Sequence, residues 1–300
     1  SSPGREGPSA EGLLALTRDQ DGVLYTPLAR LARGSFASPI LAYEHIDESR
    51  RPVVLKRLPA RNRAFRRAFA EELLQGLECG VHKNLVRCRR LARDDQGLFA
   101  VHGWVPGLDL AQVLRRAAER DVHVPLAVAV AVGRQLAEAL RFLHRQRHHG
   151  SFSPSNVLLR LDGRLKLQLP DGPREPDRDA LRSEDMLFLP RRRLDPRGPS
   201  KASDLRAVGE LLCELVGLST DSLLELQSRS PTLAWALERC LGHEQSEQLR
   251  GASELSWALD NAAEEVGPRD DEACLAALLE ELDVPNARDK AEKLQPKRAG

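Results

Sequence analysis

The segment His148–Leu159 constrains the fold more than any other part of the chain, because a polar loop stands there between two apolar elements. Before it, apolar residues recur at helical spacing over Leu126–His144 and predict a long helix. After it, the run Val157–Leu159 predicts a short buried strand. The sequence therefore predicts a helix, a polar loop and a strand in succession.

This loop resembles the catalytic loop of protein kinases, H-R-D-L-x-x-x-N followed by a strand. His149 takes the place of the histidine, Gly150 of the arginine, Ser151 of the aspartate and Asn156 of the asparagine. In a kinase the aspartate accepts the proton of the substrate hydroxyl. A serine without a partner base cannot do so at neutral pH, and general-base help is worth about 10²–10⁴-fold in rate. The resemblance implies a kinase-shaped chain that is catalytically inactive.

The glycine-rich loop of kinases, G-x-G-x-x-G, corresponds to Leu31–Ala37, where only Gly34 remains. Glycines let the backbone approach phosphates with no Cβ in the way. An ordinary hairpin also fits these residues, and we expect a hairpin that no longer clamps a triphosphate.

The strand Pro52–Leu58 resembles the V-A-I-K strand, so Lys56 matches the lysine that pairs with the phosphates and with a helix glutamate. A helix is expected from Arg61 to about Glu78. Within it we select Glu72 as the paired glutamate, with Glu71 as the alternative. This pair would orient the helix with or without nucleotide.

The run Val81–Val86 resembles the H-P-N-I-V segment of the small lobe, and a buried strand is expected at Leu98–Val101. The following residues resemble the hinge, with His102 as gatekeeper and Gly103 to Val105 facing adenine. A metal role for His102 is not expected, because no ligand partners stand at useful spacing.

The magnesium-binding aspartate of D-F-G is replaced by Leu169, counted from the catalytic loop, and Asp171 lies two residues later. Asn156 alone is a neutral ligand that holds Mg²⁺ poorly. We therefore expect no metal site and no certain cofactor, and at most weak, magnesium-independent binding of ATP or another nucleotide. Arg191 stands at the glutamate of A-P-E, and Leu249 stands at its arginine partner.

The segment Ser203–Leu215 resembles the S-D-x-x-S-x-G helix of the large lobe, in which Asp204 would hold the backbone of the catalytic loop. Further amphipathic helices are expected over 221–265, with Trp235 and Trp257 in the core. A last amphipathic helix is expected over Asp271–Leu282; the sequence does not decide whether it docks on the same chain or binds another.

Composition limits the classes of partner. The chain has 45 Lys and Arg against 44 Asp and Glu, which argues against a whole-protein footprint for nucleic acid or membrane. The nine-residue apolar run Val124–Val132 is too short for a membrane span, which needs about 20 residues. Local basic clusters remain, namely Arg61, Arg63, Arg66 and Arg67, and residues 191–193. Five cysteines without ligand spacing indicate reduced thiols in the cytoplasm.

Together these features resemble a degenerate member of the bacterial Hanks-type serine/threonine kinase family. We expect an α+β bilobal fold, with a tail at 1–22, a β-rich small lobe at 23–106, a helical large lobe at 107–266, and a helix with a basic tail at 267–300. The implied function is that of a pseudokinase that acts as a scaffold or regulator in signalling by binding another protein. The alternative is an active serine/threonine kinase or ATP-binding transferase with non-standard residues, Asp171 among them.

Overall fold

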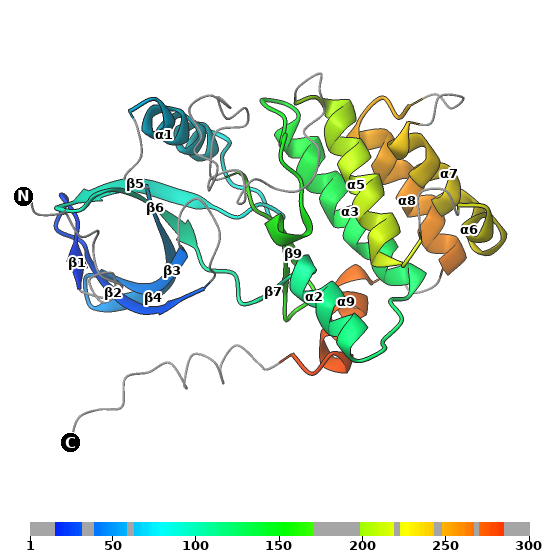
Figure 1. Cartoon of the computed structure of the whole chain (residues 1–300), viewed down its shortest axis with the longest axis horizontal. Coiled ribbons are helices and arrows are strands. Elements are labelled where there is room, and N and C mark those ends of the chain that lie inside the picture. The colour runs from blue at the N-terminus through cyan, green and yellow to red at the C-terminus, as the bar shows by residue number, and fades with distance from the viewer. Residues whose placement is uncertain are drawn as a thin grey trace, which may run out of the picture. The chain divides into compact units, whose positions relative to one another are not determined.

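The computed structural model describes residues 16–31, 39–58, 63–170, 199–218, 223–242, 248–266 and 270–284. The chain divides into two compact units (Figure 1). Of the described residues, unit 1 contains those up to Glu78 and Arg87–Trp104, and unit 2 contains Cys79–Val86 and those from Val105 onward. Unit 1 is a sheet with one helix, and unit 2 is mainly helical, so the α+β, kinase-type fold class is confirmed.

The described part of unit 1 forms a six-stranded antiparallel sheet with the order β1-β2-β3-β4-β6-β5. The strands are β1 (Thr17–Arg18), β2 (Leu24–Arg30), β3 (Pro39–Ile46), β4 (Ser49–Arg57), β5 (Cys88–Asp94) and β6 (Gly97–Gly103). The sheet curls on itself, and the Gln20 N–H donates to the Arg93 carbonyl (2.9 Å) beside the opposite edge (Figure 1). The residues enclosed are Tyr25, Ile40, Ala42, Val53, Leu55, Ala92, Phe99 and Val101.

This closure corrects the expected tail over residues 1–22. Residues 1–15 lie outside the described part, but Thr17 and Arg18 pair with β2, and Asp19 is only 5% exposed. Asp19 is buried because it accepts hydrogen bonds from Tyr25 (3.1 Å) and Arg90 (2.8 Å). The sheet therefore begins before the kinase-like motifs do.

Unit 1 has one described helix, α1 (Arg63–Glu78), which packs against β5. Arg61, where the helix was expected to begin, lies outside the described residues. Glu72 and Leu73 are buried, whereas Leu74 is 48% exposed, so one face of the helix lies on the sheet.

Unit 2 contains a small antiparallel sheet of β7 (Gly107–Asp109), β8 (Val157–Arg160) and β9 (Leu165–Leu167). Gly107 is required here, because its φ is +154° and a Cβ would stand 1.9 Å from the Leu159 carbonyl oxygen. The segment Cys79–Val86, expected in the small lobe, groups instead with unit 2. The Val86 N–H donates to the Leu167 carbonyl (2.9 Å) and thereby ties this segment to β9.

The helices of unit 2 pack around α3 (Leu126–Leu143), which contacts α5, α8 and α9. Gly133 on α3 allows close packing, since a Cβ there would stand 2.8 Å from a Leu259 methyl and 2.9 Å from a Leu212 methyl. The other described helices are α2 (Leu110–Glu119), the short 3₁₀ helix η2 (Pro154–Asn156), α5 (Lys201–Leu215), α6 (Leu223–Arg229), α7 (Pro231–Leu241), α8 (Ala252–Val266) and α9 (Asp271–Glu281). No helix in the described ranges has the length and apolar character to cross a membrane.

The last helix, α9, docks on its own chain. Leu275, Leu278 and Leu279 are buried in the core of unit 2. At its N-terminus, Asp271 accepts a hydrogen bond from Arg134 of α3 (2.9 Å). The structure thus decides the question that the sequence left open.

Trp257 was expected in the core, and this prediction is wrong. Its side chain is 61% exposed on α8 and meets only the edge of Trp235, with the ring centres 6.5 Å apart. Trp235 is partly buried and packs against the core, as expected.

Candidate functional site

One carboxylate anchors the loop between α3 and β8. Asp204 lies in the first turn of α5, which begins with a capping box at Ser200, and is 1% exposed. It accepts hydrogen bonds from the backbone N–H groups of His149 (2.7 Å) and Gly150 (2.8 Å) and lies 2.9 Å from His144 Nε2. The prediction that Asp204 holds the loop backbone is confirmed.

The same contacts keep Asp204 ionised. Burial by itself would raise the pKa of this carboxyl, but the hydrogen bond from His144, the electrostatic effect of the nearby His149 ring and the two backbone N–H groups outweigh it, so the pKa is lowered. A carboxylate that is enclosed and already bound to three donors is not available to take a proton from a substrate. Asp204 is therefore a positioning residue.

His149 connects the loop to the end of β9. Its ring is buried; Nδ1 accepts from the Ser151 N–H (3.3 Å), and Nε2 lies 2.9 Å from the Gln168 carbonyl. Because Nδ1 accepts, Nε2 carries the proton and donates to that carbonyl, which defines the neutral tautomer. The ring also packs on Phe152, with the ring centres 4.5 Å apart.

Asn156 braces the loop from the other side. Its side-chain amide donates to the Ser151 carbonyl (2.8 Å), and its own carbonyl accepts from the Gln168 N–H (2.7 Å). These bonds keep the loop in a fixed conformation in the absence of any ligand.

Two residues are predicted to stand where kinases have carboxylates. Ser151, predicted at the base position, is half-buried, and Leu169, predicted at the D-F-G aspartate, packs against the hydrophobic core of unit 2. A hydroxyl without a base accepts a proton poorly, and a hydrocarbon cannot bind Mg²⁺. The described residues also contain no group of three or more His, Cys, Asp or Glu side chains arranged to hold a metal ion.

Gly150 is predicted to stand at the arginine of the kinase loop, and its backbone conformation favours glycine. Its φ is +73°, in the left-handed region that L side chains adopt at a cost of about 1–2 kcal/mol. The loop is therefore built around a residue without a side chain.

In unit 1, Lys56 on β4 and Glu72 on α1 are both buried, with 4% and 7% exposure. Buried charged groups of this kind are nearly always paired, and each takes part in interactions within the structure. That they pair with each other, and that they contact nucleotide, stay predictions.

The predicted hinge residues have backbone partners of their own. Gly103 ends β6, and its N–H donates to the Arg87 carbonyl (2.9 Å). His102 is buried, with 6% exposure, and Val105, the first residue of the second part of unit 2, is half-buried. Contacts of Gly103 and Val105 with adenine stay predictions.

Several predicted residues lie outside the described part of the chain: Gly34, Arg61, Asp171 and residues 191–193. Of the basic cluster near α1, the side chain of Arg67 is described; it is exposed and pairs with Glu71 (2.8 Å) one helical turn away. This is a common solvated surface pair.

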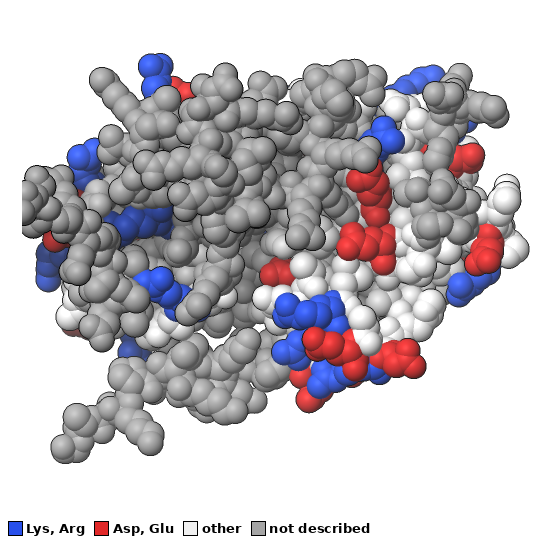
Figure 2. All heavy atoms as spheres, in the orientation of Figure 1, with Lys and Arg blue, Asp and Glu red and all other residues white. Residues whose placement is uncertain are grey.

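Charges of both signs are interspersed on the face of unit 2 in Figure 2, where α2 and α9 lie. Arg115 pairs with Glu119 (3.8 Å) and Arg120 with Asp283 (3.4 Å) in these elements. Such mixing gives no single-sign surface for nucleic acid there.

Sequence reasoning missed two residues that hold the loop. His144 contacts Asp204, and its ring lies 5.9 Å from that of His148, edge to face. The backbone groups of Gln168 form hydrogen bonds with both His149 and Asn156. Backbone hydrogen bonds of this kind leave no sequence signal.

Comparison with known proteins agrees with this geometry. The sequence model of the protein tyrosine and serine/threonine kinase family matches residues 26–171. Mitogen-activated protein kinase 15 of Caenorhabditis elegans is 26% identical over 206 residues, which cover 62% of this chain and 42% of that protein. A probable serine/threonine-protein kinase of Dictyostelium discoideum is 29% identical over 96 residues, 32% of this chain and 22% of that protein. The chain thus spans less than half the length of these relatives.

Among solved structures, the PknI kinase domain of Mycobacterium tuberculosis superposes with a TM-score of 0.59 at 18% identity, covering 80% of this chain and 96% of that one. A double mutant of the same domain gives 0.57 at 19% identity, with 82% and 97% covered. These similarities concern the fold. The chain therefore has a protein kinase-like fold.

Proposed function

We propose that this chain is a pseudokinase, a kinase-like domain that acts by binding another protein and does not transfer phosphate. One observation carries the proposal: the catalytic loop keeps its Asp204 anchor and its Asn156 brace, while Ser151 occupies the base position. The scaffold of the loop is intact and its proton acceptor is missing. Leu169, which packs against the core, supports the same reading, because no carboxylate stands at that position to hold Mg²⁺.

The test is a phosphoryl-transfer assay with radiolabelled ATP, Mg²⁺ and generic protein substrates. We expect no incorporation above that of heat-denatured chain, with an active kinase added separately to show that the assay works. ATP titration followed by calorimetry should show weak binding or none, with no gain from Mg²⁺. Robust transfer that is lost in Lys56→Met would contradict the proposal.

We further propose that the partner is a signalling protein and that the complex forms in the cytoplasm. All five cysteines are free, and burial raises the pKa of the Cys213 thiol to about 11, which suits a reducing compartment. Cross-linking in cells followed by mass spectrometry should recover the same partner with wild type and Ser151→Ala. Dependence of the complex on ATP turnover would count against a scaffold role.

An active kinase or ATP-binding transferase is the second candidate. It is favoured by the two relatives, a mitogen-activated protein kinase and a probable serine/threonine-protein kinase. Phosphorylation that disappears in Asp171→Ala but survives in Asp162→Ala, a change at an exposed residue of unit 2, would favour this candidate. The origin of the chain in bacteria also stays a proposal.

A further inference from the structure

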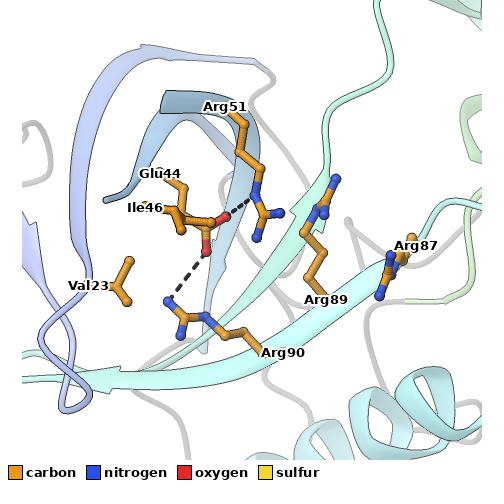
Figure 3. Close-up of a pocket in the computed structure, with 7 residues that line it drawn as sticks. All are labelled: Val23, Glu44, Ile46, Arg51, Arg87, Arg89 and Arg90. Atoms are coloured by element: carbon orange, nitrogen blue, oxygen red, sulfur yellow. Dashed lines mark hydrogen bonds and ion pairs between the residues drawn. The ribbon is translucent and has the colours of Figure 1, made fainter. Parts of the chain in front are cut away.

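A basic pocket opens within the curled sheet of unit 1 (Figure 3). Its volume is about 340 Å³, within the range of small-molecule sites. The pocket lies entirely in unit 1 and involves none of the residues assigned above to catalysis or nucleotide. Its lining consists of Val23, Glu44, Ile46, Arg51, Arg87, Arg89 and Arg90.

Strand register explains how so many arginines reach one pocket. Glu44 on β3 stands directly opposite Arg51 on β4. On β5, the register shifts between Cys88 and Arg90, so Arg89 is the extra residue of a β-bulge. Consecutive residues of a regular strand point to opposite faces, and a bulge re-aims them. Arg89 and Arg90 therefore both face the pocket.

The acids near the pocket neutralise only part of its charge. Glu44 accepts hydrogen bonds from Arg51 (2.6 Å) and lies 3.4 Å from Arg90, as the dashed lines in Figure 3 show. Asp19, behind them, is 2.8 Å from Arg90. Asp21 also lies 4.0 Å from Arg90, so three acids pair with two of the four arginines. Among the described residues, no acid lies within ion-pair distance of Arg87 or Arg89, and the Glu44 carboxylate whose charge reaches Arg89 is already bound by Arg51 and Arg90.

The excess of positive charge is most costly at Arg89, whose side chain is half-buried. Its Nε atom is buried with no hydrogen-bond partner among the described atoms. Burial first, and then the charges of Arg51 and Arg87, lower the pKa of its guanidinium. A buried donor and an unpaired charge both cost stability. Unit 1 thus keeps a cation that its own residues do not satisfy.

We propose that this pocket binds a small phosphomonoester, with the phosphate on Arg87 and Arg89 and the organic part on Val23 and Ile46. A phosphomonoester carries a charge of roughly −1.5 to −2 at pH 7, and it would supply an anionic partner to the two guanidinium groups that have no ion pair of their own. Arginine is suited to phosphate because its planar group donates two parallel hydrogen bonds. The acceptor oxygens would also satisfy the Nε of Arg89.

The test is calorimetric titration of the full chain, in buffer free of phosphate, with phenyl phosphate, inorganic phosphate and phenol. We expect phenyl phosphate to bind more tightly than inorganic phosphate and phenol not to bind. Arg89→Gln should weaken phenyl phosphate binding about tenfold or more, the loss expected for one charged hydrogen-bonded pair. Arg93→Gln, an exposed arginine on the same strand, is the matched control and should bind as wild type does.

Thermal melting separates binding from a structural role. Without ligand, Arg89→Gln should melt at the wild-type temperature or above it, because the change removes repulsion from Arg51 and Arg87. At one concentration, phenyl phosphate should raise the melting temperature of wild type and of Arg93→Gln clearly more than that of Arg89→Gln. A melting temperature several degrees lower in unliganded Arg89→Gln would overturn the proposal. So would absence of binding by wild type, equal affinity for inorganic phosphate and phenyl phosphate, or equal loss in Arg89→Gln and Arg93→Gln.

Discussion

At the scale of single residues, the catalytic loop depends most on Asp204. Its carboxylate satisfies the N–H groups of His149 and Gly150, and no other described contact replaces them. Asp204→Ala would leave buried donors without an acceptor, and we expect a loss of about 3 kcal/mol in the free energy of unfolding. Urea denaturation measures it. Glu210→Gln, on an exposed part of the same helix, should change stability by less than about 0.5 kcal/mol.

The lowered pKa of Asp204 gives this effect a pH dependence. The folded state binds the proton less readily than the unfolded state, whose carboxyl titrates at about 4. The stabilisation is therefore complete above that value and is lost as the pH falls through the lower, folded pKa. The difference in the free energy of unfolding between wild type and Asp204→Asn should stay constant from about pH 5.5 to about pH 7 and should shrink at lower pH. A difference that grows in acid would contradict this assignment.

Gly150 provides a second prediction. Because its φ is +73°, Gly150→Ala should destabilise the chain by about 1 kcal/mol. Gly150→Asn should cost less, since asparagine tolerates the left-handed region better than alanine does. Chemical denaturation of both variants gives the order. Equal stability of Gly150→Ala and wild type would show that the loop backbone can rearrange.

Much of this loop could be predicted from the sequence, and the reason is physical. A motif specifies side chains at fixed spacing, so the sequence could predict that Asp204 holds the loop backbone and where Ser151 stands in the loop. The role of His144 was not, because it depends on where the end of α3 meets the start of α5. The arginine pocket was also unpredicted, because its residues come from three strands and a β-bulge whose register no local pattern reveals.

At the scale of elements, periodicity predicted the helices and strands of unit 2 well. The predicted helices over Leu126–His144 and Ser203–Leu215 correspond to α3 and α5. Periodicity identifies an apolar face but not its partner, which is why the docking of α9 could not be predicted. It also misplaced Trp257, since an aromatic residue at the edge of an apolar face can remain in solvent.

The docking of α9 is testable through Leu275. This side chain is fully buried, and Leu275→Ala should lower the free energy of unfolding by about 2–5 kcal/mol. Glu280→Ala, exposed on the same helix, should have little effect. If α9 instead served mainly to bind another chain, Leu275→Ala would alter the oligomeric state measured by light scattering while leaving monomer stability unchanged.

At the scale of the whole molecule, the proposal rests on two missing carboxylates. Ser151→Asp restores one of them, and we expect the variant still not to transfer phosphate, because Leu169 leaves the metal unsupported. The radiolabel assay described above measures this, with Ser151→Asn as a control of similar size without charge. Phosphoryl transfer by Ser151→Asp would mean that another side chain supplies the Mg²⁺ ligand that Leu169 lacks, which would contradict this part of the proposal.

The closure of the unit 1 sheet has a practical consequence for anyone who prepares a shorter version of this protein. A fragment that starts at Val23 would keep every kinase-like motif but would lose β1 and the carboxylate of Asp19 beneath Arg90. Arg90 would then keep Glu44, which it shares with Arg51, as its acidic partner in the described structure, and the Tyr25 hydroxyl would lose a partner. Expression boundaries for crystallisation or partner screening should therefore fall at or before Leu16.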